Sequence, residues 1–123
     1  MAYFGVTATS TGLRAAAGGD LAGGLRRRLA TVPAGAPIVV LIHGWKFHPA
    51  LPGADPHHTL FGYGPSTEPR SRSWPAGLGI DDDDGASGLA IGFGWPASAA
   101  HLACLLRRGR TGFAEVYDRA VTL

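Results

Sequence analysis

Residues 37–46 read PIVVLIHGWK, and this stretch decides the fold. Five consecutive apolar, mostly β-branched residues, Ile38–Ile42, are bounded by Pro37 before them and by His43 and Gly44 after them. A short continuous run of this kind is typical of a strand that is buried on both faces of a parallel sheet. Because ligands of open α/β sheets bind just beyond the carboxyl ends of the strands, we expect the residues that follow this strand to be functional.

A second buried strand is predicted at residues 88–95, GLAIGFGW, and Pro96 ends it. Two buried strands joined by a long connection predict a right-handed parallel βαβ unit. Tyr3–Thr9 is rich in β-forming residues and predicts an edge strand, and residues 13–17 predict a second short strand after a turn. The fold class is therefore α/β, with a mostly parallel sheet whose N-terminal strands are the candidates for antiparallel pairing.

Helices are predicted from capping residues and from the spacing of apolar residues. Asp20 is placed to cap one helix, Asp55 followed by Pro56 begins another over residues 57–61, and Ser73 begins a third. The first of these helices carries Leu21, Leu25 and Leu29 on one face. After Pro96, six apolar residues recur at helical spacing and predict two helical segments: Leu102, Leu105, Leu106, Phe113, Val116 and Ala120.

Composition bounds the classes of protein to which the chain can belong. Its 123 residues support one domain, and 46% hydrophobic with 16% charged residues is a globular composition. The net charge is +2, with arginines gathered at 26–28 and near 107–110. The acidic run Asp81–Asp84 offsets these arginines and no aromatic residues interleave them, so we expect no nucleic-acid partner.

Cysteine usage and hydropathy exclude further classes. The single cysteine, Cys104, excludes an intramolecular disulfide and the paired-cysteine metal motifs. The N-terminus has no basic region followed by a long apolar core, and no apolar stretch approaches the roughly 20 residues that span a bilayer. We therefore expect a soluble, cytoplasmic protein with no membrane partner.

Five segments of the chain are informative when they are taken together and in order: LIHGWKF at 41–47, DPHHTLF at 55–61, SWPAGLGI at 73–80, GLAIGFGWPA at 88–97 and GFAEVYDRA at 112–120. In that order they resemble a subgroup of small bacterial α/β-hydrolases. PIVVLIHGWKF resembles the third strand and oxyanion loop of the lipases and esterases in this superfamily. The resemblance implies a single, partial α/β-hydrolase domain over residues 1–123, because a complete fold of this type usually needs more than about 200 residues.

The resemblance also implies an oxyanion loop formed by His43, Gly44 and Trp45. The backbone N–H of Trp45 would donate a hydrogen bond to the developing oxyanion, and donors of this kind stabilise a transition state by roughly 3 kcal/mol. Lys46, Phe47 and Trp95 are the candidates for residues that line the pocket. His43 is expected to brace the loop through backbone hydrogen bonds, because the general base comes late in this fold.

No serine has the context of a catalytic nucleophile, which this fold places in a G-x-S-x-G elbow after a strand. Ser66 follows Pro65, and Ser87 precedes a predicted strand. The resemblance implies that the elbow belongs to a strand after the helix that begins near Phe113. We therefore expect no catalytic residue and no cofactor in this chain. It would act on an ester or other acyl bond only when it is completed, and its open sheet edge favours a homo-oligomer or a complementing chain.

Two alternatives remain open at this point. One is a non-catalytic binding or interaction module that keeps the half-fold without its chemistry. The other is a metal-dependent enzyme that uses some of His43, His48, His57 and His58. Their spacing matches no zinc signature, so we expect no metal, and His57 and His58 are expected to cap or solvate a short helix.

Overall fold

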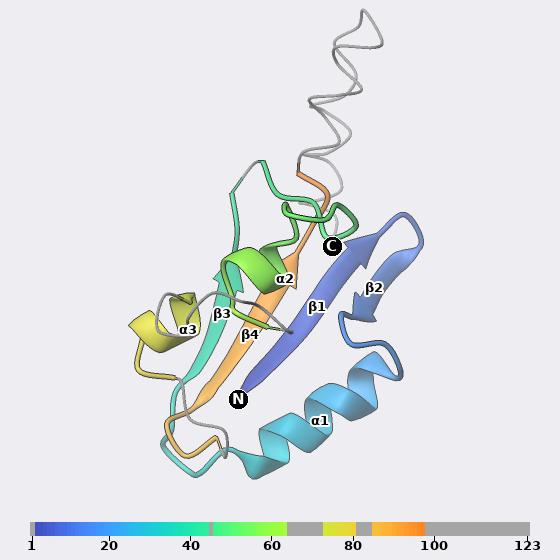
Figure 1. Cartoon of the computed structure of the whole chain (residues 1–123). Coiled ribbons are helices and arrows are strands. Elements are labelled where there is room, and N and C mark those ends of the chain that lie inside the picture. The colour runs from blue at the N-terminus through green and yellow to red at the C-terminus, as the bar shows by residue number, and fades with distance from the viewer. Residues whose placement is uncertain (1, 45, 64–72, 81–84, 98–123) are drawn as a thin grey trace, which may run out of the picture.

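The computed structural model describes residues 2–44, 46–63, 73–80 and 85–97 of the chain (Figure 1). Within them, four strands form one mixed sheet in the order β2-β1-β4-β3. The strands are β1 (Tyr3–Thr9), β2 (Gly12–Ala15), β3 (Ile38–Ile42) and β4 (Leu89–Gly94). The α/β class with a mostly parallel sheet is confirmed.

Pairing in the sheet agrees with the expected directions. The hairpin of β1 and β2 is antiparallel and pairs Val6 with Ala15. β4 lies between β1 and β3 and is parallel to both, with Val6 beside Phe93 and Ile42 beside Phe93 on its other side. The predicted parallel pairing of the two apolar strands is therefore confirmed, with their connection returning the chain from β3 to its neighbour β4.

Three helices begin at the predicted caps: α1 (Leu21–Thr31), α2 (Pro56–Thr59) and α3 (Trp74–Gly77). The Asp20 carboxylate accepts hydrogen bonds from the backbone N–H groups of Ala22 and Gly23 at 3.2 and 3.0 Å. The Asp55 carboxylate accepts from the backbone N–H of His57 at 2.9 Å. Such caps satisfy N–H groups that a helix start would otherwise leave without a partner.

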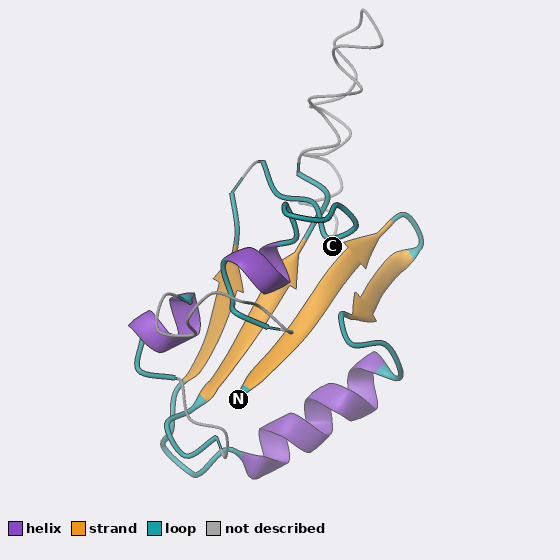
Figure 2. Cartoon of the chain, viewed as in Figure 1, coloured by secondary structure: helices purple, strands orange, loops and turns teal. Residues whose placement is uncertain are grey.

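The helices lie on opposite faces of the sheet. Tyr3 and Phe4 are neighbours on β1, so their side chains point to opposite faces. The Tyr3 ring packs beside Phe61, just after α2, whereas Gly24 of α1 lies against the Phe4 ring. Figure 2 shows α2 lying in front of the sheet and α1 along its lower edge. The main core is on the Tyr3 face and contains Ala2, Tyr3, Leu41, Phe61, Ile80 and Ala90.

Two predictions about the strands are wrong. β1 is an interior strand, because β2 and β4 pair with its two sides. β3 is buried on one face only: Leu41 lies in the core, but Ile38, Val40 and Ile42 are 52%, 59% and 62% exposed. The physical reason is that the described part of the chain covers only the Tyr3 face of β3.

Some predictions fall outside the described residues. These are the acidic loop at 81–84, the serine Ser66 that was rejected as a nucleophile, and the helical spacing between residues 102 and 120. Among the residues that the structure describes, no helix is long and apolar enough to cross a membrane.

Candidate functional site

His43 lies at the carboxyl end of β3 and is almost completely buried, with 2% of its surface exposed. Its ring joins two loops. Nδ1 lies 2.7 Å from the carbonyl oxygen of Gly44, and Nε2 lies 3.0 Å from the backbone nitrogen of Trp95, just after β4. The indole Nε1–H of Trp95 donates in return to the carbonyl oxygen of His43, at 3.1 Å. The backbone hydrogen bonds expected for His43 are thus present, to Gly44 and to Trp95.

These partners fix the protonation state of the His43 ring. A carbonyl oxygen can only accept, so Nδ1 carries the proton and donates it to Gly44. The Trp95 backbone N–H can only donate, so Nε2 is the acceptor and the ring is neutral. Burial lowers the pKa of His43 below its usual value, in agreement with this assignment. Because both ring nitrogens are occupied, His43 positions the loop and is not free to act as a base.

Aromatic side chains enclose the His43 ring. The Trp95 indole stacks on it with ring centroids 5.7 Å apart and an interplanar angle of 18°. Phe47 meets it edge to face, with centroids 5.6 Å apart, and the Phe47 carbonyl accepts from the backbone N–H of Ala97 at 3.0 Å. The structure therefore brings together three of the predicted residues, His43, Phe47 and Trp95, as one cluster that ties the loop after β3 to the segment after β4.

The remaining predicted residues differ in their environment. Gly44 is exposed and faces open space, so nothing described crowds its backbone. Lys46 is exposed and has a φ of 99°, which only glycine adopts readily. Such a backbone costs about 1–3 kcal/mol and is typical of functional loops. Trp45, whose N–H is the expected oxyanion donor, lies outside the described residues.

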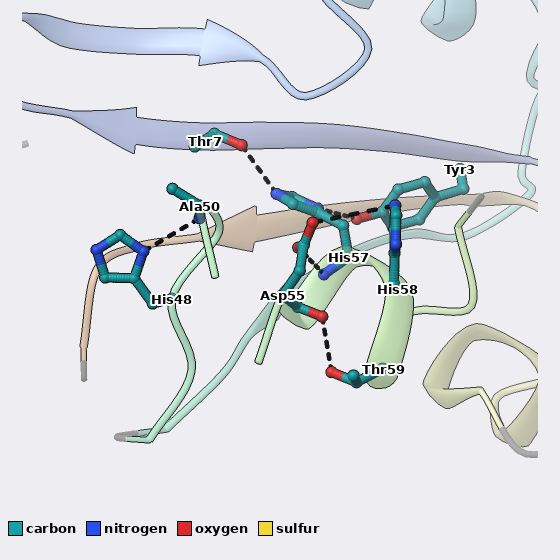
Figure 3. Close-up of polar contacts among 8 residues, drawn as sticks. All are labelled: Tyr3, Thr7, His48, Ala50, Asp55, His57, His58 and Thr59. Atoms are coloured by element: carbon teal, nitrogen blue, oxygen red, sulfur yellow. Dashed lines mark hydrogen bonds and ion pairs between the residues drawn. The ribbon is translucent and has the colours of Figure 1, made fainter. Parts of the chain in front are cut away.

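A second buried polar cluster lies on the Tyr3 face and was not predicted (Figure 3). His57, in the first turn of α2, is 2% exposed. The Tyr3 hydroxyl lies 2.6 Å from its Nδ1 and the Thr7 hydroxyl lies 2.9 Å from its Nε2. A neutral imidazole has one donor and one acceptor nitrogen, and a hydroxyl can serve either, so the whole cluster is satisfied. Burial lowers the pKa of His57 and raises the pKa of Tyr3, so both side chains are uncharged at neutral pH.

Three glycines make room for the His57 and Tyr3 rings. A Cβ on Gly94 would lie 2.5 Å from His57 Nε2, and one on Gly5 would lie 3.1 Å from its Nδ1. A Cβ on Gly92 would overlap the Tyr3 hydroxyl and Phe61. Glycines two residues apart on a strand share a face. The G-x-G pattern at the end of β4 is therefore the sequence signal that another side chain packs closely against the strand.

The expectation that His57 caps or solvates a helix is wrong, because its ring is buried between α2 and the sheet. His58 does point to solvent, and its Nε2 lies 4.0 Å from the Asp55 carboxylate. Nδ1 of His48 accepts a hydrogen bond from the backbone N–H of Ala50 at 3.1 Å. Among the described residues, no group of three or more His, Cys, Asp or Glu side chains could hold a metal ion.

Two cavities lie away from the His43 cluster. One, of about 430 Å³, lies between α1 and the first residues of β1, and its lining includes Phe4, Arg27 and Tyr63. The other, of about 360 Å³, is lined by residues 49–53 with Asp55 and His58. Neither is lined by residues 43–47, so neither is a pocket of the candidate loop.

Comparison of the chain with protein-family models, with curated proteins and with solved structures finds no match.

Proposed function

We propose that this chain supplies the oxyanion loop of a serine hydrolase of the α/β-hydrolase type, which cleaves an ester or other acyl bond. The described residues contribute the loop after β3. The serine, the acid and the catalytic histidine are supplied from outside residues 1–123, by a longer chain or by a partner chain.

The observation that carries this proposal is the position of His43. Its side chain is hydrogen-bonded to both loops at the carboxyl end of the parallel strands, where α/β proteins bind their ligands. An oxyanion hole stabilises a transition state only when its donors are held in place beforehand. A neutral histidine that is locked between Gly44 and Trp95 provides such support for the backbone that follows it.

The expected chemistry needs one backbone N–H from this loop and a second from the residue after the nucleophile. The serine hydroxyl would attack the acyl carbon, and the two donors would share the negative charge that develops on the carbonyl oxygen. Lys46, with its left-handed backbone, marks where this loop departs from ordinary geometry. The site takes a small acyl or ester substrate and needs no cofactor.

The free edge of β3 supports the same proposal. In the described residues β3 pairs only with β4, so its other edge carries backbone groups that a further strand could pair with. A strand added there would be next to the candidate loop. This is the position from which a nucleophile elbow would face the oxyanion donor.

The test is ester hydrolysis by the product of the complete reading frame that contains this chain. We expect hydrolysis of p-nitrophenyl butyrate that a sulfonyl fluoride abolishes and that EDTA leaves unchanged. Loss of activity with EDTA would instead support the metal-dependent alternative. Absence of hydrolysis, with the protein shown to be folded by circular dichroism, would overturn the proposal.

The open edge of β3 also favours a second candidate, a non-catalytic interaction module whose sheet is completed by another chain. The two candidates differ in one observable property. An interaction module would form a stable complex or dimer through β3 and show no serine that reacts with a fluorophosphonate.

A further inference from the structure

A cavity of about 430 Å³ lies between α1 and the start of β1, in the half of the sheet that is farthest from β3. Within the described sheet, β2 pairs only with Val6–Thr9, so strand pairing on this side stops before residues 3–5. The edge of β1 at residues 3–5 forms one wall of the cavity, and α1 and the loop at residues 17–19 form the others. Binding sites for small molecules commonly have volumes of about 300–1,000 Å³, so the cavity is large enough for one small ligand.

Two glycines in α1 shape the wall of the cavity. Gly23 and Gly24 lie inside this helix, where each glycine costs about 1 kcal/mol relative to alanine. A Cβ on Gly24 would lie 3.1 Å from Cε2 of Phe4, and one on Gly23 would lie 3.3 Å from Nη1 of Arg27. The Phe4 ring and the Arg27 guanidinium therefore lie directly against the backbone of α1. No residue of α1 is buried, so the helix covers the cavity without filling it.

The charged groups on the cavity wall favour an anion. Arg27 and Arg28 both line the cavity. Asp20 lines it too, but its carboxylate already accepts hydrogen bonds from the backbone N–H groups of Ala22 and Gly23. In the described part of the chain, neither arginine forms an ion pair with a carboxylate. A guanidinium binds a carboxylate or a phosphate through two parallel hydrogen bonds, so these two side chains are donors for the oxyanion of a ligand.

Aromatic side chains line the same cavity on both sides of the β1 edge. Phe4 is on the face of β1 that α1 covers. Tyr63 is on the other face, where its ring packs beside Tyr3 with centroids 5.2 Å apart. Because both Phe4 and Tyr63 line the cavity, it continues around the edge of β1 from one face to the other. Aromatic rings pack favourably against one another, so this wall favours a ligand that contains a ring.

We propose that this cavity binds a small aromatic anion. The carboxylate or phosphate group of the ligand is held by Arg27 and Arg28, and its ring packs along the edge of β1 with Phe4 and Tyr63. The inference does not depend on the proposed hydrolase function, because neither His43 nor Trp95 lines the cavity.

The test is an NMR titration of the isotope-labelled 123-residue chain with two probes, benzoate and phenyl phosphate. We expect saturable shifts of the backbone amide signals of Gly18, Gly19 and Gly24 with at least one probe, and the preferred probe identifies the anionic group. Benzamide has the ring without the charge, and inorganic phosphate has the charge without the ring. Each of these two compounds is expected to bind at least about tenfold more weakly than the better probe, because each lacks one half of the recognised structure.

Arg27→Gln is expected to weaken binding of the better probe about tenfold or more, because it removes charge-assisted hydrogen bonds. Arg26→Gln is the matched control, since it removes the same charge from an exposed neighbour that does not line the cavity. Arg28→Gln gives the same test in case Arg27→Gln reduces folding. Equal effects of Arg26→Gln and Arg27→Gln, or no saturable shift with either probe in a folded chain, would overturn the proposal. Binding of benzamide or of inorganic phosphate as tight as that of the better probe would also overturn it.

Discussion

His43 and Trp95 are hydrogen-bonded to each other in both directions. The Trp95 backbone N–H donates to His43 Nε2 at 3.0 Å, and the Trp95 indole N–H donates to the His43 carbonyl oxygen at 3.1 Å. The two residues are 52 positions apart in the chain and follow two adjacent parallel strands. Their pairing therefore fixes the two loops of the candidate site relative to each other, independently of the sheet hydrogen bonds.

Replacing His43 by alanine is expected to destabilise the protein by about 2–4 kcal/mol. The change leaves the Trp95 N–H without its partner, at about 1–3 kcal/mol, and removes a buried, stacked ring, whereas the exposed Gly44 carbonyl can bond to water. The measurement is the free energy of unfolding in urea. His58→Ala is the matched control, because His58 has a side chain that is 52% exposed and a weak ion pair. Equal effects of the two variants would contradict the bracing role.

Gly92→Ala is expected to destabilise the fold by about 1–3 kcal/mol, the usual effect of overpacking a core. The added methyl group would overlap the Tyr3 hydroxyl and Phe61. Gly77→Ala serves as the control, because a Cβ at position 77 meets no atom within 4 Å. Thermal unfolding followed by circular dichroism measures both, and a neutral Gly92→Ala would show that the Tyr3 ring is not held against β4.

The Tyr3–His57–Thr7 cluster is expected to behave as a unit. Tyr3→Phe and Thr7→Val each remove one partner of a buried ring nitrogen, and each is expected to reduce the free energy of unfolding by about 1–3 kcal/mol. Once one hydrogen bond is lost the ring can move, so the double variant should lose less than the sum of the two. Strict additivity in this double-mutant cycle would contradict the shared network.

Stability is expected to decrease as the pH falls below about 6.5, the usual pKa of histidine. Burial lowers the pKa of His43 and of His57 in the folded protein, so the unfolded chain binds these protons first. Their contribution is complete above the unfolded pKa and is lost as the pH falls toward the folded values, by up to about 1.4 kcal/mol per pH unit for each group. Urea midpoints between pH 7.5 and pH 5 measure the effect, and a flat profile over that range would contradict the assignment of neutral rings.

Local signals in the sequence predicted most of the secondary structure. Asp20, Asp55 and Ser73 begin helices because each side chain accepts hydrogen bonds from backbone N–H groups nearby in the sequence. The apolar run Ile38–Ile42 predicted a strand but not its exposed face, because a run of apolar residues does not reveal what lies over each side.

Long-range contacts were the part that the sequence did not reveal. His57 is buried because Tyr3 and Thr7, 54 and 50 residues away, hydrogen-bond its ring. In the sequence, only Gly92 and Gly94 of β4 indicated that another side chain packs closely against this strand. The loop after β3 was predicted as a functional site from its position at a strand end, and the partner that fixes it, Trp95, was predicted only as a pocket residue.

The central claim is that this chain holds an oxyanion loop and that the nucleophile comes from elsewhere. The most direct test is labelling with a fluorophosphonate, which reacts with activated serines, followed by mass spectrometry of the modified peptide. We expect residues 1–123 alone to show neither labelling nor ester hydrolysis, and the complete reading frame to be labelled at one serine beyond them. Labelling of Ser66 or Ser87, with ester hydrolysis that is lost when that serine is replaced by alanine, would contradict the claim.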